Sequence, residues 1–342
     1  MAVVSGRLRR VVRLVVRCAQ LAALLLAAGL LSGVLYETVG AWQDNRVIAR
    51  VGRSVDIGGR SLNIACAGDG TPTVVFESGR VSPGYVWVPT HREVSKFTRA
   101  CWYDRAGLGW SDPGPDPNWG DSAARDLHAL LERAGVKSPL VLVGHSFGGY
   151  IIRLYVEAYP HEAAGLVFVD AAHEDAGTIR GMPYRARPNL PRWLIHAIAT
   201  GVSYVGFTRF VERGERARPQ AWTEQEFDTL TRLRRRRTAG IADAAEGPEV
   251  ATSSLVRSTH RWEQLPIVVL SQAKMPRNDT PEGESERSVV RDWIALQREL
   301  AARSRRGRLV LTDSGHGIPL EDPAAIVSAV RELVDELRGD SR

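Results

Sequence analysis

Cysteine is scarce in this sequence, with 3 residues among 342, and no cluster of cysteine, histidine and acidic residues has the spacing of a metal site. Neither a phosphate-binding loop nor a dinucleotide fingerprint is present. The chain also has no internal repeat, and no low-complexity tract apart from one run of arginines. These absences argue against chemistry that depends on a metal ion or a nucleotide. We therefore expect no metal ion and no cofactor.

Length and composition are those of a globular protein. Hydrophobic residues make up 44% of the chain and charged residues 25%, and 342 residues suffice for one large α/β domain with an inserted subdomain, or for two ordinary domains. The net charge of +6 comes largely from arginines near the N-terminus and in Arg232–Arg237. That run lacks interleaved aromatic residues and any nucleic-acid motif, so we expect no nucleic-acid partner. It is either a solvated helix face or a contact with anionic lipid headgroups.

The N-terminal region differs in character from the rest of the chain. Residues 1–17 are basic, and an apolar run, Cys18–Tyr36, follows them. A helix of about 20 apolar residues can cross a bilayer, and positive charge before it predicts a cytoplasmic N-terminus. We expect a single-pass membrane anchor with the rest of the chain on the extracytoplasmic side. The alternative is a cleaved signal peptide, which would make the same chain a secreted protein.

Residues 37–53 are predicted to form a polar linker, and residues 54–340 a domain in which buried strands alternate with helices. This alternation is typical of a mostly parallel sheet with helices on both faces. Residues 173–262 interrupt it with a long segment of helical pattern, in which Thr223 and Glu226 have the spacing of a capping box. The predicted strands are 54–57, 60–67, 73–78, 100–104, 139–143, 165–170, 267–271 and 308–313.

The most informative stretch is Gly144–Gly149, in which Ser146 has a glycine two positions before it and another two positions after it. A buried strand precedes the serine and a helix follows it. We therefore expect Ser146 in a sharp, strained turn that tolerates only small residues at 144 and 148. This is the G-x-S-x-G pattern of a nucleophilic serine, which needs a base within hydrogen-bonding reach.

His316 is the predicted base. It directly follows the last predicted strand, at the same carboxyl edge of the sheet as Ser146, and imidazole titrates near neutral pH. We expect His145 to have a structural or supporting role, and His173 to lie near the site. Ordinary helix or loop positions are expected for the other histidines, which are His91, His128, His161, His196 and His260.

The chain from about Ser54 to Arg338 resembles the α/β-hydrolase fold superfamily. The resemblance rests on Gly144–Gly149, on Asp104–Ser111 after the fourth strand, and on Ser314–His316 near the end. It implies an α/β fold with an eight-stranded, mostly parallel sheet, and the chain order nucleophile, acid, histidine. Similar members carry a helical cap between the sixth and seventh strands. Residues 173–262 match that cap.

The acid that orients His316 has several candidates by the same resemblance. Some members place it at the end of the sixth strand, where this chain has Asp170, and many place it after the seventh strand, where the first carboxylate is Asp279. We prefer Asp170 because Asp279 lies rather far beyond the end of its strand. Glu282 is a further alternative.

The resemblance assigns the oxyanion hole to the backbone N–H groups of Phe147 and Arg80. Relatives usually have His-Gly in the loop after the third strand, whereas this chain has Ser78–Gly79, which retains the glycine. Asp104 and Arg105 are not expected to be catalytic. We expect them to hold their own turn and to bind backbone amides.

Two cysteines fall in predicted core strands. In the superfamily's sheet order the second and fourth strands are neighbours, so Cys66 and Cys101 would lie on adjacent strands. The strand register decides whether they reach disulfide distance. Such a bond would suit an exported domain.

Ser146 argues against epoxide hydrolases and haloalkane dehalogenases, which share this architecture but use an aspartate nucleophile. We expect a serine hydrolase that cleaves a small-molecule carboxylic ester or related acyl bond through an acyl-enzyme, and an anchored domain favours an apolar ester. The alternatives are peptide, carbon–carbon or acyl-transfer chemistry at the same residues, or a non-enzymatic binding protein on the same fold. Trp193, Phe207, Phe210 and Trp222 would line a pocket or fill the core of the cap.

Overall fold

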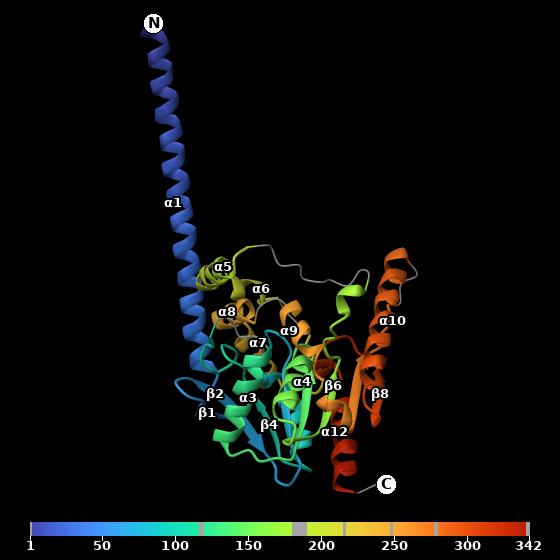
Figure 1. The fold of residues 1–342 in the computed structure, drawn as a ribbon. Helices are drawn as coiled ribbons and strands as arrows, with labels where there is room; N and C mark the ends of the chain where they lie inside the picture. The colour runs from blue at the N-terminus through green and yellow to red at the C-terminus, as the bar shows by residue number, and fades with distance from the viewer. Residues whose placement is uncertain are drawn as a thin grey trace.

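The computed structural model describes residues 2–115, 120–179, 190–214, 217–246, 249–276 and 280–339. An eight-stranded sheet lies at its centre, with the strand order β1-β2-β4-β3-β5-β6-β7-β8 (Figure 1). β2 pairs antiparallel with β1 and β4, and the remaining neighbours are parallel. The strands are β1 (Arg53–Asp56), β2 (Ser61–Ala67), β3 (Thr73–Glu77), β4 (Ala100–Tyr103), β5 (Leu140–His145), β6 (Ala163–Val169), β7 (Ile267–Gln272) and β8 (Gly307–Thr312).

Each face of the sheet packs against its own helices, because successive side chains of a strand point to opposite faces. Leu142 and Phe168 belong to an apolar core shared with α3, α4 and α10. Val141 and Val167 belong to the core on the other face, with α2 and α12. The predicted mostly parallel sheet with helices on both faces is confirmed. These helices are α2 (Val88–Val94), α3 (Gly120–Ala134), α4 (Gly148–Ala158), α10 (Pro281–Ala302) and α12 (Pro323–Arg338), and η1 (Gly84–Trp87) and α11 (Ile318–Glu321) are short.

A group of helices lies between β6 and β7 in the chain and beside the loops of the sheet in space (Figure 1). Leu108, after β4, packs on Ala239 and Ala242 of α8, so these helices cover the carboxyl ends of the strands. Thr223 and Glu226 form the predicted capping box at the start of α7. The inserted elements are η2 (Ala176–Thr178), α5 (Arg192–Tyr204), α6 (Phe207–Val211), α7 (Glu224–Arg234), α8 (Arg237–Ala245), α9 (Glu249–Val256) and η3 (Arg261–Gln264).

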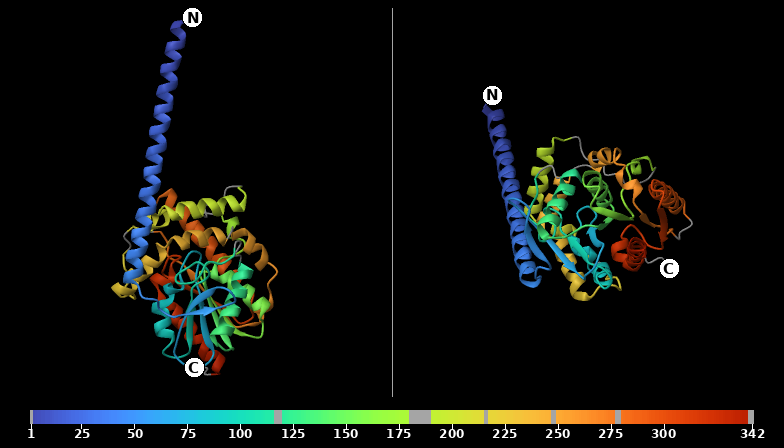
Figure 2. Two further views of the ribbon diagram at one scale, coloured as in Figure 1. Left: turned by 90° about the vertical axis from the view of Figure 1, so that its left-hand side faces the viewer. Right: turned by 60° about the horizontal axis from the view of Figure 1, so that its bottom comes forward.

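The N-terminal helix α1 (Ala2–Val47) projects far from the body of the molecule (Figures 1 and 2). Its 46 residues correspond to a length of about 70 Å. Within the described residues it is the helix long and apolar enough to cross a membrane, with an 18-residue window of mean hydropathy 2.1 that makes no buried contact. The helix continues to Val47, so most of the segment 37–53, which we expected to be a linker, is helical.

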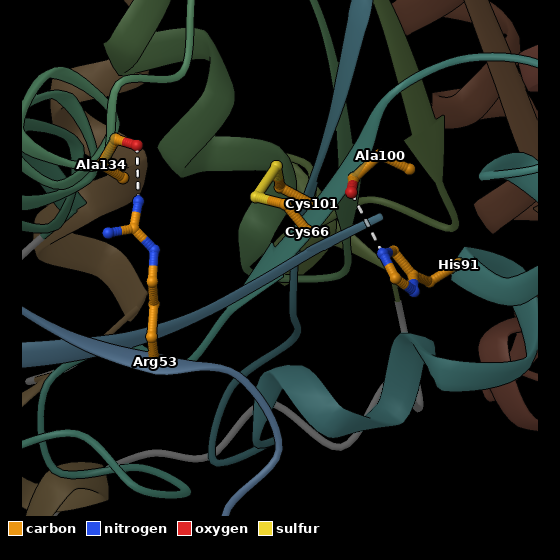
Figure 3. Close-up of a disulfide and its surroundings, with 6 residues drawn as sticks. All are labelled: Arg53, Cys66, His91, Ala100, Cys101 and Ala134. Carbon is orange, nitrogen blue, oxygen red and sulfur yellow. Dashed lines mark hydrogen bonds between the residues drawn. A yellow bond between two sulfur atoms is a disulfide. The ribbon is translucent and has the colours of Figure 1, made fainter. Parts of the chain in front are cut away.

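Cys66 and Cys101 form a disulfide between β2 and β4 (Figure 3). The two residues are direct partners in the antiparallel register, with their Cα atoms 4.1 Å apart. Two hydrogen bonds lie nearby: Arg53 of β1 donates to the carbonyl oxygen of Ala134 at the end of α3 at 2.6 Å, and His91 of α2 donates to that of Ala100 on β4 at 3.0 Å. The register thus answers the question that the sequence left open.

Loss of this disulfide is expected to lower the free energy of unfolding by about 2–4 kcal/mol, because the bond restricts the unfolded chain between residues 35 positions apart. The test is a urea titration of the full chain in detergent, comparing wild type with Cys66→Ser/Cys101→Ser. Cys18→Ser is the matched control, since Cys18 is free and exposed. An unchanged midpoint in the double variant would show that the bond does not stabilise the fold.

Candidate active site

Ser146 occupies a tight turn between β5 and α4. Its φ of 51° lies in the left-handed region, which costs a non-glycine residue free energy. A Cβ on Gly144 would lie 2.7 Å from the carbonyl oxygen of Gly148, and a Cβ on Gly148 would lie 2.7 Å from that of Glu77. Both glycines are therefore required by the close approach of the backbone, as the sequence pattern indicated.

Asp170 follows β6 directly, beside Ser146, because the register pairs His145 with Val169. Its carboxylate is fully buried. One oxygen, Oδ1, accepts hydrogen bonds from the backbone N–H of Gln272 at 2.9 Å and from the indole N–H of Trp293 at 2.7 Å. These two donors stabilise the ionised carboxylate and hold its other oxygen in one direction.

His316, in the loop after β8, contacts both residues. Its Nδ1 lies 2.6 Å from Oδ2 of Asp170, and its Nε2 lies 3.0 Å from Oγ of Ser146. A carboxylate oxygen only accepts, so Nδ1 carries the proton and Nε2 is left to accept from the serine hydroxyl. The structure thus brings together Ser146, His316 and Asp170. Asp279 lies outside the described residues, and Glu282 is exposed in the first turn of α10.

His145 supports the loop that carries His316. Its Nε2 donates to the carbonyl oxygen of His316 at 2.9 Å. Desolvation of the ring lowers the pKa of His145 to about 3, and the neighbouring His316 acts in the same direction. His145 is therefore neutral near physiological pH, and its hydrogen bond to the loop does not change with pH in that range. This contact gives the supporting role predicted for His145 a physical basis.

The loop after β3 approaches Ser146 closely. A Cβ on Gly79 would lie 2.8 Å from Nδ1 of His145 and 3.3 Å from Cβ of Ser146, so only glycine fits there without displacement. The buried guanidinium of Arg105 donates to the carbonyl oxygens of Ser78 at 2.6 Å and of Gly79 at 2.9 Å. In a planar trans peptide the N–H points opposite to the C=O. The N–H of Arg80 therefore points away from Arg105.

Phe147 is the residue before α4, where backbone N–H groups have no partner within the helix. The side chain of Arg80 turns toward the inserted helices, and its Nε donates to Oδ1 of Asp243 at 2.6 Å. Its guanidinium is therefore engaged in a contact with α8. The two residues predicted for an oxyanion hole thus lie in the loop after β3 and at the start of α4.

Asp104 and Arg105 hold their loop, as predicted. Asp104 accepts from the backbone N–H of Gly84 at 2.8 Å and of Trp110 at 3.0 Å. Arg105 binds backbone carbonyl oxygens instead of amides, and it forms buried ion pairs with Glu77 at 2.6 Å and Glu246 at 2.7 Å. Burial raises the pKa of Glu77, against the opposing effect of Arg105.

A group of His173, Asp175 and Glu299 offers side-chain atoms within 4.8 Å of one another, the spacing that a metal ion needs. Its acidic members are already paired, Asp175 with Arg257 at 2.6 Å and Glu299 with Arg303 at 2.8 Å. A cation there would face two guanidinium groups. His173 was expected near the reactive serine; its Nε2 lies 3.0 Å from Glu299 on α10.

Known proteins resemble this chain in both sequence and fold. The sequence profile described as the Alpha/beta hydrolase family matches residues 74–329. The chain belongs to this family. An AB hydrolase superfamily protein of Gibberella zeae is 25% identical over 299 residues, which cover 78% of this chain and 87% of that protein.

Two further matches set the limits of this likeness. The Bacillus subtilis protein YqjL is 32% identical over 111 residues, 32% of this chain and 44% of YqjL, so the chain spans less than half of that relative's length. A thermophilic esterase of Thermogutta terrifontis superimposes with a TM-score of 0.55 at 20% identity, over 83% of this chain and 98% of the esterase. This structural likeness shows the fold.

Trp293 was not identified from the sequence of this hydrolase, because it lies on α10, 123 positions from the carboxylate that it contacts. Trp293→Phe keeps the aromatic packing but removes one hydrogen bond to Asp170. We expect it to slow the reaction of Ser146 with a fluorophosphonate about 10-fold, the equivalent of one hydrogen bond.

Trp222→Phe is the matched control for this variant. Trp222 is equally buried, but its indole nitrogen has no hydrogen-bond partner in the described structure. Its labelling rate should equal that of wild type. Equal rates for Trp293→Phe and wild type would show that the indole N–H does not position the carboxylate.

Proposed function

We propose that this hydrolase cleaves a carboxylic ester, or a related acyl bond, with Ser146 as nucleophile, His316 as general base and Asp170 as the acid that orients it. The observation that carries the proposal is a pair of hydrogen bonds: His316 donates to Asp170 at 2.6 Å, and Ser146 donates to His316 at 3.0 Å. A serine hydroxyl becomes an effective nucleophile only beside such a base.

The reaction proceeds in two halves. Ser146 Oγ attacks the acyl carbon while His316 Nε2 takes the hydroxyl proton, and Asp170 stabilises the imidazolium through Nδ1. His316 then gives the proton to the leaving alcohol oxygen, and the acyl group remains on Ser146. Water repeats the attack with His316 as base, which releases the carboxylic acid and restores the serine.

The negative charge that develops on the carbonyl oxygen requires donors in place before the reaction begins. The proposal assigns these donors to the backbone N–H groups of Phe147 and Arg80. The N-terminal position of Phe147 on α4 supports the first assignment, and the Arg105 hydrogen bonds to the loop support the second. The side chain of Arg80 has no part in this step.

The same residues could serve peptide-bond cleavage, carbon–carbon bond hydrolysis or acyl transfer to an alcohol. Product analysis with candidate acceptors separates these reactions from ester hydrolysis. A binding protein without activity would keep the fold but leave Ser146 unreactive. The two hydrogen bonds at His316 favour an active serine over that alternative.

We also propose that residues 18–36 of α1 anchor the hydrolase in a membrane, with residues 1–17 in the cytoplasm and the hydrolase domain on the extracytoplasmic side. The apolar, unburied stretch of α1 and the arginines that precede it support this orientation. The disulfide supports an oxidising compartment. A substrate beside the membrane would be an apolar small-molecule ester.

The nucleophile is tested by fluorophosphonate labelling and by hydrolysis of a p-nitrophenyl ester. Ser146→Ala should abolish labelling and reduce kcat by about 10⁶, and Asp170→Asn should reduce it by about 10⁴. Asp279→Asn tests the alternative acid and should match wild type. Loss of activity in Asp279→Asn with normal activity in Asp170→Asn would move the acid. A folded wild type that is not labelled would refute the serine mechanism.

The second oxyanion donor is tested by two changes at one position. Arg80→Pro removes the backbone N–H and should lower kcat on the order of 10²- to 10³-fold, whereas Arg80→Ala keeps it and should lower kcat far less. Circular dichroism spectra and melting curves of both variants check the fold. Equal kcat values for a folded Arg80→Pro and for Arg80→Ala would exclude this N–H from the oxyanion hole.

A further inference from the structure

Large apolar side chains are exposed together on α5 and α6. Trp193 is 70% exposed, Phe207 56% and Val211 57%. Of the four cap residues that the sequence suggested for a pocket or a packed core, only Trp222 is buried; Trp193, Phe207 and Phe210 face outward. We call the exposed set the α5–α6 apolar surface, formed by Trp193, Ile198, Val202, Phe207, Phe210 and Val211.

This surface is unusual because nothing charged interrupts it. Every exposed residue of α5 is uncharged, and the segment Leu190–Val211 contains no acidic residue. Single exposed apolar residues are common on soluble proteins, but apolar residues that cover half of a helix mark an interaction site. Among the described residues, none covers the apolar side chains on this half of α5. A partner that covers them must be apolar.

The surface lies beside the end of the apolar stretch of α1. A Cβ on Gly33 would lie 2.7 Å from the carbonyl oxygen of Val205, and a Cβ on Gly206 would lie 2.7 Å from the ring of Tyr36. The turn between α5 and α6 therefore touches α1 where its apolar run, 18–36, ends. The α5–α6 apolar surface therefore adjoins α1 at the end of its apolar run.

Buried ion pairs lock this contact. Arg209 of α6 donates to Glu37 at 2.9 Å and to Asp44 at 2.6 Å, and all three side chains are almost completely buried. Gly40 admits the guanidinium, since a Cβ there would lie 2.6 Å from Nε of Arg209. Residues 33, 37, 40 and 44 repeat at three- and four-residue intervals, so they form one face of α1. The surface is thus held at a fixed level relative to α1.

The direction of α5 also matters. In the left view of Figure 2, α5 lies across the end of the body from which α1 projects, crosswise to α1. A helix that lies crosswise to a membrane-spanning helix, at the level where the span ends, lies in the plane of the headgroups. Amphipathic helices bind membranes in this orientation, with apolar side chains inserted between the lipids.

The edge of the surface carries arginines, which suit the headgroup region of a membrane. The guanidinium of Arg213 lies 3.9 Å from the ring centroid of Phe210, and that of Arg237 lies 4.8 Å from the ring centroid of Tyr204. Arg192 begins α5. Trp and Tyr rings favour the membrane–water interface, and arginines beside them attract anionic headgroups.

We infer that the α5–α6 apolar surface docks into the headgroup region of the bilayer that α1 enters, so that the helices over the reactive serine are held against the membrane. The inference rests on the anchoring of α1 given under the proposed function. The occupant is a lipid bilayer, and a second copy of this chain is the competing occupant.

The test uses the full chain with Cys18→Ser, which leaves the disulfide cysteines and no free thiol. Single cysteines are introduced as Ile198→Cys and Phe207→Cys on the surface, as Leu25→Cys in the apolar run, and as Lys137→Cys at the opposite end of the sheet. Each is labelled with an environment-sensitive fluorophore and reconstituted into vesicles of phosphatidylcholine and phosphatidylglycerol at a ratio of about 3:1, with quenchers at shallow or deep acyl positions. All labelled variants must retain the wild-type circular dichroism spectrum.

Labels at 198 and 207 should be blue-shifted and quenched several-fold by the shallow quencher, while the label at 137 is unaffected. The label at 25 should be quenched best by the deep quencher. If 25 is deeply quenched but 198 and 207 behave like 137, docking is refuted while the anchor stands. If the label at position 25 is also unquenched, both the docking of the surface and the membrane anchor are refuted. If the lipid quenchers do not affect the label at position 198, but labels on different chains quench each other, the surface binds a second copy of the chain instead.

Discussion

The parallel register of β5 with β6 is the constraint on which the site depends. Because His145 lies opposite Val169, the next residue on each strand is Ser146 on one and Asp170 on the other. Both leave their strands in the left-handed region, with φ of 51° and 43°. Such conformations cost about 1–3 kcal/mol each, and the hydrogen bonds between the two turns offset that cost.

Hydrogen bonds join these two turns to each other and to β7. The N–H of Ser146 donates to Val169 at 3.1 Å, the N–H of Asp170 donates to Leu270 at 2.7 Å, and the N–H of Ala172 returns to the carbonyl oxygen of Ser146 at 2.9 Å. A one-residue shift of β5 against β6 would break the two bonds that involve Ser146 and would move Ser146 out of its position beside Asp170. The sheet therefore sets the distance between the backbones of Ser146 and Asp170, whatever rotamers their side chains adopt.

Local patterns in the sequence predicted much of this arrangement, and long-range contacts account for the rest. It was possible to predict the strand, the turn at Ser146 and the following helix. The reason is local: the backbone around the turn is so close that positions 144 and 148 must be glycine. The sequence favoured Asp170 over Asp279 only by the distance of each from the end of its strand, because both are aspartates after neighbouring strands. Trp293 could not be found at all, since its contact with Asp170 depends on how α10 packs on the sheet.

The arginine run shows a second kind of limit. Arg232–Arg237 was expected to be a solvated helix face or a lipid contact, and the arginines of the run are half-buried, so it is not a fully solvated face. Arg232 pairs with Asp44 at 2.9 Å, and Arg236 donates to the carbonyl oxygen of Gly109 at 2.8 Å. The composition of a segment gives the number of its charges, whereas the partners of those charges are known only from the structure.

Three arginines, Arg105, Arg209 and Arg232, connect α1, the inserted helices and the loops of the sheet through ion pairs. Asp44 of α1 binds both Arg209 and Arg232, and Glu246 of the inserted segment binds Arg105, which in turn holds the loop beside Ser146. Removing one partner of a buried ion pair costs about 3–5 kcal/mol, because the other charge stays buried alone. The inserted helices therefore cannot move away from α1 or from the loop without exposing or stranding charges. That rigidity fixes Ser146 in position relative to the N-terminal helix.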